Sequence, residues 1–109
     1  MKRGQLYRVF KGASDDPCKY RVFVVISRQV LLDSRFSTAI CAPVYSACHG
    51  LSTQVPVGID NGLKHESSIH CDQLISIHKN SLHNFVGTLN PSQMEALDRA
   101  LAIAVGIDE

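Results

Sequence analysis

Six short stretches with the composition and period of β-strands follow one another over residues 5–89 of this chain. Each is rich in β-branched or aromatic residues, several alternate polar with apolar side chains, and Gly, Pro and Asn separate them. They cover residues 5–10, 20–27, 36–45, 51–57, 69–77 and 85–89. Strands this short, with no helical pattern between them, favour a small barrel of mostly antiparallel strands over alternating strand–helix units.

The last stretch of the chain has the period of a helix instead. Asn90 is a suitable N-cap, Pro91 suits the first helical position, and Gln93 is placed to complete a capping box. Gly106 is suited to end the helix. The residues expected on the apolar face are Met94, Leu97, Leu101, Ala104 and Val105. The fold class predicted is therefore mainly β, with a C-terminal α-helix packed across the barrel.

Length and composition indicate one globular domain, residues 1–109. Apolar residues make up 45% and charged residues 19% of the chain, which is ordinary for a protein with one core. The longest apolar run, residues 22–26, is strand-sized, and no leader opens the sequence, so we expect a cytoplasmic protein without a membrane segment. The four cysteines are then expected to be reduced thiols.

The net charge of +1 hides an uneven distribution. Residues 1–35 carry eight basic and three acidic side chains, a charge of +5, and the remainder carries three basic and seven acidic ones, a charge of −4. Such a basic half allows a local phosphate-binding face. The alternative is that the fold scatters these charges over a solvated surface.

His70 and Asp72 are the first candidates for chemistry. On a strand over residues 69–77, side chains two apart share a face, so these two would project together, with Cys71 and Gln73 on the other side. An imidazole beside a carboxylate is a workable acid–base pair near neutral pH. The alternative is a structural contact at a strand end.

Arg21 and Ser46 are further candidates, each at the end of a predicted strand. The guanidinium of Arg21 could bind a phosphate group through two hydrogen bonds. The alternative is that Arg21 is an ordinary exposed residue of the strand. The hydroxyl of Ser46 could donate a hydrogen bond to a phosphate oxygen, or it could cap a turn. No nucleophile elbow, Walker loop or dinucleotide fingerprint is present.

A metal site is not expected, although the chain has five histidines and four cysteines. Cys41 and Cys48 are seven positions apart, and His65 and His70 are five apart, with no pair of Cys-x₂₋₄-Cys spacing. We therefore predict neither a metal nor a cofactor.

Five motifs, taken in order, resemble the MazF/PemK family of toxin endoribonucleases over residues 3–106. They are Arg3-Gly4-Gln5-Leu6-Tyr7, Lys19-Tyr20-Arg21-Val22-Phe23-Val24-Val25-Ile26-Ser27, Pro43-Val44-Tyr45-Ser46, Gly62-Leu63-Lys64 and Cys71-Asp72-Gln73-Leu74. The resemblance implies an SH3-like barrel, a homodimer with single-stranded RNA along its groove, and a cognate antitoxin. It also implies metal-independent cleavage by the RNA's own 2′-hydroxyl, which leaves a cyclic phosphate and a 5′-hydroxyl.

The resemblance also assigns roles to residues. Arg21 matches the family's catalytic arginine, and Asp72 matches an aspartate that works with a basic residue two positions earlier, here His70. Substrate contacts are expected from Lys19, Tyr45, Gln73 and Lys79.

Four positions depart from the family's pattern. Gln5 stands in place of an aspartate, Val22 in place of the proline after the catalytic arginine, and Ile75 in place of an arginine. The fourth departure lies among the candidate site residues. Tyr45 stands where many members end the third strand with threonine, and Ser46 follows it. Either Ser46 or Tyr45 supplies the missing hydroxyl, or the mechanism depends on His70 and Asp72. The alternative function is a catalytically weak or inactive barrel that binds protein, as the related CcdB-type barrels bind DNA gyrase.

Overall fold

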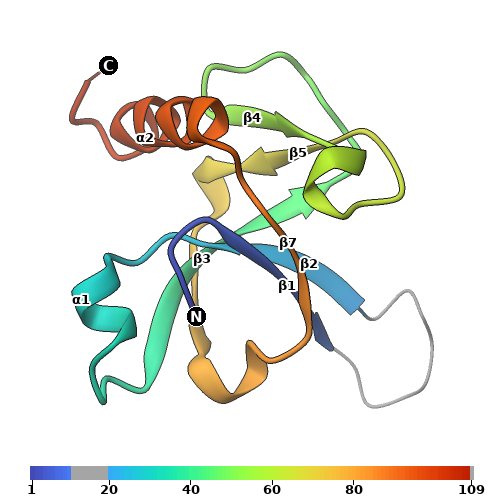
Figure 1. The fold of residues 1–109 in the computed structure, drawn as a ribbon. Helices are drawn as coiled ribbons and strands as arrows, with labels where there is room; N and C mark the ends of the chain where they lie inside the picture. Colours follow the sequence, from blue (N-terminus) through green and yellow to red (C-terminus); the bar gives the residue numbers. More distant parts are fainter. Residues whose placement is uncertain (11–19, 109) are drawn as a thin grey trace.

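The computed structural model describes residues 1–10 and 20–108, which form a curled antiparallel sheet with a helix across one side (Figure 1). The strands are β1 (Gln5–Phe10), β2 (Tyr20–Val25), β3 (Thr38–Tyr45), β4 (Gln54–Val57), β5 (Ser67–His70), β6 (Ile75–His78) and β7 (Phe85–Thr88). The helices are α1 (Gln29–Leu32) and α2 (Pro91–Ala104). The predicted fold class, a small antiparallel barrel with a C-terminal helix, is confirmed, the sheet being curled into a half-barrel.

The long strand β3 organises the sheet. The strand order is β4-β5-β3-β2-β1-β7, and β6 also pairs with β3. β5 pairs with the end of β3, at Val44 and Tyr45, while β6 pairs with its beginning, from Thr38 to Cys41. The end of β3 therefore lies between β2 and β5, where three segments far apart in the sequence meet.

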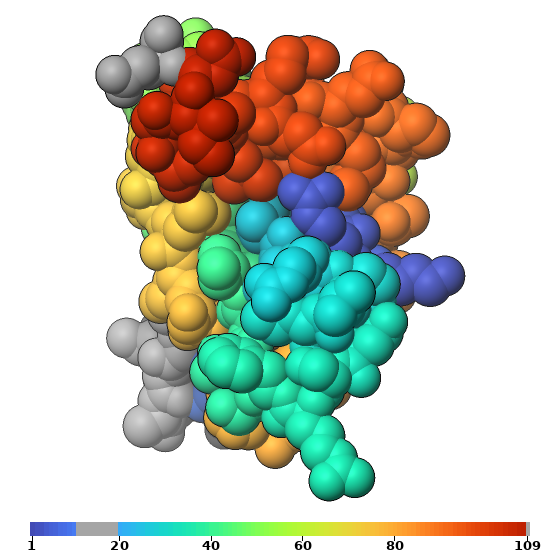
Figure 2. Space-filling view, turned by 90° about the vertical axis from the view of Figure 1, so that its left-hand side faces the viewer, coloured from blue at the N-terminus to red at the C-terminus, as the bar shows by residue number. Residues whose placement is uncertain are grey.

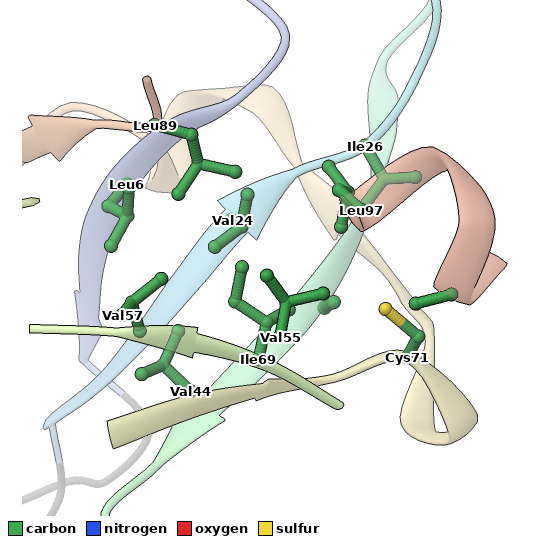
Figure 3. Close-up of a cluster of buried hydrophobic side chains, with 12 residues drawn as sticks. Leu6, Val24, Ile26, Val44, Val55, Val57, Ile69, Cys71, Leu89 and Leu97 are labelled. Atoms are coloured by element: carbon green, nitrogen blue, oxygen red, sulfur yellow. The ribbon is translucent and has the colours of Figure 1, made fainter. Parts of the chain in front are cut away.

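Strands β1, β2 and β3 bury side chains on both faces, which explains the apolar run at residues 22–26. Val24 belongs to a core cluster with Leu97 of α2, and its neighbour Val25 belongs to a second cluster on the other side of the sheet. A strand covered on both faces has a continuous apolar run instead of an alternating one. Figure 3 shows the first cluster, in which side chains of β1 to β5 point toward the helix.

Helix α2 begins as the sequence predicts. Asn90 Oδ1 accepts a hydrogen bond from the Gln93 amide at 2.8 Å, and Gln93 Oε1 accepts one from the Asn90 amide at 3.0 Å. Leu97 is fully buried, but Val105, expected on the same face, is 56% exposed because the helix ends at Ala104. Within the described part of the chain, no helix is long and apolar enough to cross a membrane.

Removal of the cap is expected to loosen the start of this helix. Asn90→Ala takes away Oδ1, the acceptor of the Gln93 amide, and keeps the backbone amide that donates to Gln93 Oε1, so the free energy of unfolding should fall by about 1 kcal/mol. Urea titration of this variant against Ser92→Ala, an exposed neighbour in the same turn, measures the difference. Equal stability of the two variants would contradict the role of the cap.

The predicted strand over residues 69–77 is wrong. β5 ends at His70, Cys71–Gln73 forms a 3-10 turn, and β6 begins at Ile75. The physical reason lies in the pairing with β3, since the register of β6 is shifted by three residues relative to that of β5. The turn takes up these three residues. The predicted hairpin loop over residues 11–19 lies outside the described residues.

Three cysteines, Cys41, Cys48 and Cys71, are free thiols, and Cys18 lies outside the described residues. Burial raises the pKa of Cys41 to about 12, and burial together with the charge of Asp72 raises that of Cys71 to about 11. Cys48 is exposed.

Alkylation should therefore separate these thiols. Because the thiolate is the reactive form, iodoacetamide at pH 8 is expected to label Cys48 in the folded protein and to leave Cys41 and Cys71 unmodified. Peptide mapping by mass spectrometry checks this, with urea-unfolded protein as the control in which all three react. Since the two buried thiols ionise more easily in the unfolded chain, the free energy of unfolding should also fall as the pH rises above about 9.

Candidate functional site

Arg21 and Tyr45 come together at the ends of two paired strands. Val22 of β2 pairs with Val44 of β3, so the next residue outward on each strand, Arg21 and Tyr45, meet side by side. The guanidinium carbon of Arg21 lies 4.3 Å from the centroid of the Tyr45 ring. At this distance the cation is attracted by the face of the ring.

The Tyr45 ring has two further contacts. The ring of His70 lies nearly perpendicular to it, with 4.8 Å between centroids and 78° between planes. The Tyr45 hydroxyl donates a hydrogen bond of 3.0 Å to Oε1 of Gln73. Tyr45 therefore connects the other three side chains of the cluster.

His70 is buried, and its polar contacts define its hydrogen position. Nε2 lies 3.0 Å from Ser68 Oγ and 3.1 Å from the Ala47 carbonyl oxygen, and the Ser68 hydroxyl donates to the same carbonyl at 2.7 Å. Because a carbonyl oxygen only accepts, the simplest assignment places a hydrogen on Nε2. In the neutral ring the basic nitrogen is then Nδ1.

Asp72 lies on the exposed side of the 3-10 turn, beside a pocket of about 230 Å³. The Thr53 hydroxyl donates a hydrogen bond of 2.6 Å to Asp72 Oδ2, which fixes the carboxylate. The residues that line the pocket are His49, Leu51, Thr53, Gln54, His70, Asp72 and Gln73. A base, a carboxylate and an amide thus face one space, and two of them, His70 and Gln73, also contact the Tyr45 side chain on which Arg21 lies.

The structure brings together five of the predicted site residues, although by a different local geometry. Gln73 was expected on the opposite side from His70 and Asp72, and this was wrong because the strand ends at His70. The predicted direct pairing of His70 with Asp72 is also absent among the described residues, since Asp72 bonds to Thr53. Ser46 is exposed and is the next residue after Tyr45, the last residue of β3.

Lys79, a further predicted residue, is not part of this cluster. Lys79 follows His78, which pairs with the first residue of β3, whereas Tyr45 is the last. The Lys79 ammonium donates to the carbonyl oxygens of Leu31, Leu32 and Ser34, at 2.7, 3.2 and 2.9 Å. Within one subunit it therefore anchors the end of α1. Lys19 lies outside the described residues.

Two polar residues of the site escaped the sequence analysis. Thr53 holds Asp72, and Ser68 contacts His70 from two positions earlier on the same strand. The spacing of Ser68 and His70 on a strand was a signal for the second contact. Thr53 lies 19 residues from Asp72, and only the fold brings the two together.

Across residues 1–10 and 20–108, no three histidine, cysteine or acidic side chains come together as a group that would hold a metal ion. The chemistry available to the described site is that of a cation, an imidazole, a carboxylate and hydroxyl groups.

Comparison with known proteins identifies the family. Residues 2–105 match the model of the PemK-like, MazF-like toxins of type II toxin-antitoxin systems. The chain belongs to this family. Endoribonuclease MazF3 of Mycobacterium tuberculosis strain H37Rv is 32% identical over 90 residues, which are 83% of this chain and 86% of the relative.

Solved structures of toxins share the fold. The Mycobacterium tuberculosis toxin MazF-mt6 has a TM-score of 0.81 at 28% identity, with 96% of this chain and 99% of that one covered. A mycobacterial endoribonuclease in complex with its cognate antitoxin has a TM-score of 0.84, covering 100% and 98% of the two chains. At 20% identity this second likeness concerns the fold alone.

Proposed function

We propose that this toxin is an endoribonuclease that cleaves single-stranded RNA at the cluster around Arg21. The observation that carries the proposal is the Arg21 guanidinium over the Tyr45 ring, whose other neighbour His70 lines a pocket together with Asp72. The relative MazF3, named an endoribonuclease, supports the activity. Single-stranded RNA suits an open site with an aromatic ring, because its unstacked bases and its phosphates are both accessible.

The reaction proposed is attack by the 2′-hydroxyl of the RNA on the adjacent phosphorus. A bond from the 2′-oxygen to phosphorus forms, the bond from phosphorus to the 5′-oxygen breaks, and the products are a 2′,3′-cyclic phosphate and a 5′-hydroxyl. One proton leaves the 2′-hydroxyl and one is taken up by the 5′-oxygen; His70 and Asp72 line the pocket where we place these transfers.

Arg21 would then stabilise the phosphate in the transition state. Within the described residues its guanidinium donates no hydrogen bond and forms no ion pair, so none of these residues occupies the N–H groups that would bind phosphate oxygens. Negative charge grows on these oxygens as the new bond forms, and a cation already in place stabilises that charge. We propose that the hydroxyl of Ser46, the exposed residue directly after β3, donates a further hydrogen bond to the phosphate.

Mapping of RNA ends tests the activity. A long single-stranded RNA incubated with the purified toxin in EDTA should give discrete fragments with 5′-hydroxyl and cyclic-phosphate ends. Fragments that appear only with added divalent metal would contradict the metal-independent mechanism. Intact RNA together with growth arrest in cells would point to a protein-binding toxin instead.

We also propose that the toxin is a homodimer that a cognate antitoxin neutralises inside the cell. An apolar hollow of about 310 Å³ lies between the end of α2 and the sheet, lined in part by Ile40, Val105 and Ile107, which are 43%, 56% and 79% exposed. On the face in Figure 2, the C-terminal end of the chain and the segment near residue 75 border this region. Exposed apolar surface of this kind is typical of a subunit interface. Sedimentation equilibrium measures the mass of the particle.

A further inference from the structure

We propose that Tyr45 is a positioning residue whose ring holds Arg21 and His70 in the arrangement needed for cleavage. The inference rests on the proposed ribonuclease function and concerns the one position where this chain has an aromatic residue in place of the family's threonine. Sequence reasoning considered the Tyr45 hydroxyl as a reacting group. The contacts of the side chain assign the positioning of Arg21 and His70 to its ring.

The ring is fixed from three sides. Arg21 lies over it at 4.3 Å, His70 packs against it at 4.8 Å, and Gln73 accepts the hydrogen bond from its hydroxyl at 3.0 Å. Tyr45 is also the last residue of β3, with its backbone in register with Ser68 of β5. A ring anchored in this way is a rigid surface on which a flexible side chain can rest.

Arg21 depends on such a surface, because little else among the described residues holds its charged end. The guanidinium forms no hydrogen bond or ion pair with them, and a free arginine side chain samples many rotamers. Contact with the ring face limits those rotamers and leaves the N–H groups available for phosphate. Cleavage benefits because the cation is in place before charge develops.

The hydroxyl of Tyr45 has a different partner from the ring. It points to the Gln73 amide, so neither the Arg21 contact nor the His70 contact uses it. A phenylalanine ring can make the same two contacts. The ring and the hydroxyl can therefore be tested separately by substitution.

Tyr45→Phe and Tyr45→Leu separate the two roles in steady-state cleavage of a defined RNA. We expect Tyr45→Phe to keep the wild-type rate within about twofold and Tyr45→Leu to lower kcat about tenfold with KM little changed, since the ring–cation contact is lost. Phe36→Leu, at an exposed aromatic residue ahead of β3, is the matched control and should cleave normally. An equal loss in Tyr45→Phe and Tyr45→Leu would overturn the proposal in favour of a reacting hydroxyl.

A loss confined to KM in Tyr45→Leu would also overturn it, because Tyr45 would then be a base-binding residue only. A second readout does not depend on cleavage at all. In ¹H–¹⁵N NMR spectra, the Arg21 side-chain Nε–H signal, assigned by its absence in Arg21→Lys, should carry a ring-current shift. This shift should persist in Tyr45→Phe and disappear in Tyr45→Leu. If the wild-type protein cleaves no RNA, the ribonuclease function fails while this measurement still decides whether the ring holds Arg21.

Discussion

Arg21→Ala is expected to lower the rate of RNA cleavage by a factor of about 100 to 1,000 while the protein remains folded. The loss follows from the proposed role of the guanidinium, which is to stabilise charge on the phosphate oxygens in the transition state. Stability should change little, because the side chain is only half-buried and bonds to no described residue except through the Tyr45 ring. Single-turnover rates and urea unfolding of the same preparation measure both quantities.

Two companion variants make this result specific. Arg8→Ala removes an exposed arginine from β1; because Val9 pairs with Arg21, the Arg8 side chain lies on the opposite face of the sheet, and normal cleavage is expected. Arg21→Lys keeps the positive charge but loses the planar donor group, so its rate should lie between those of Arg21→Ala and the wild type. Cleavage by Arg21→Ala at the wild-type rate would show that the phosphate is stabilised elsewhere.

Local patterns in the sequence predicted the fold where local interactions determine it. The capping box of Asn90 and Gln93 predicted the start of α2. The segments with strand composition predicted β1, β2, β3, β4 and β7, with ends that differ from the observed ones by up to three residues. The step between β5 and β6 was missed because it arises from a change of register on β3, which no property of residues 69–77 reveals. α1 was also missed, since four residues are too few to show a helical period.

The candidate site was predictable in its residue types and not in its contacts. Arg21, Tyr45 and His70 come from three different strands, and the sequence gives no sign that the Tyr45 ring lies between the other two. Lys79 differs from these three residues. A lysine at a matching position suggested a substrate contact, but pairing of β6 with the start of β3 directs its ammonium to the carbonyls at the end of α1.

Asn61→Ala is expected to lower the free energy of unfolding by about 3 kcal/mol, the largest loss of stability we predict for a single polar residue in this fold. Asn61 is 2% exposed and uses its whole amide. Oδ1 accepts from the Gly58 amide and from Gln93 Nε2, and Nδ2 donates to the Thr88 carbonyl and to Gln93 Oε1, at 2.7 to 3.0 Å. Alanine would leave the buried Gly58 amide without this acceptor and would remove the bonds to Thr88 and Gln93, and the melting temperature should fall by about 15 °C.

The same amide joins three elements, which is why a single substitution is expected to act so widely. It ties the 3-10 turn Ile59–Asn61 to the end of β7 and to the first turn of α2, and Gly87 of β7 approaches the Asn61 carbonyl so closely that a Cβ there would lie 2.0 Å from the oxygen. Asn84→Ala, at an exposed asparagine, is the matched control and should cost less than about 0.5 kcal/mol. Because the proposed dimer would be more stable at higher protein concentration, all variants are compared at one protein concentration. If Asn61→Ala unfolds at the same urea concentration as Asn84→Ala, β7 and α2 are held to the turn by apolar packing alone.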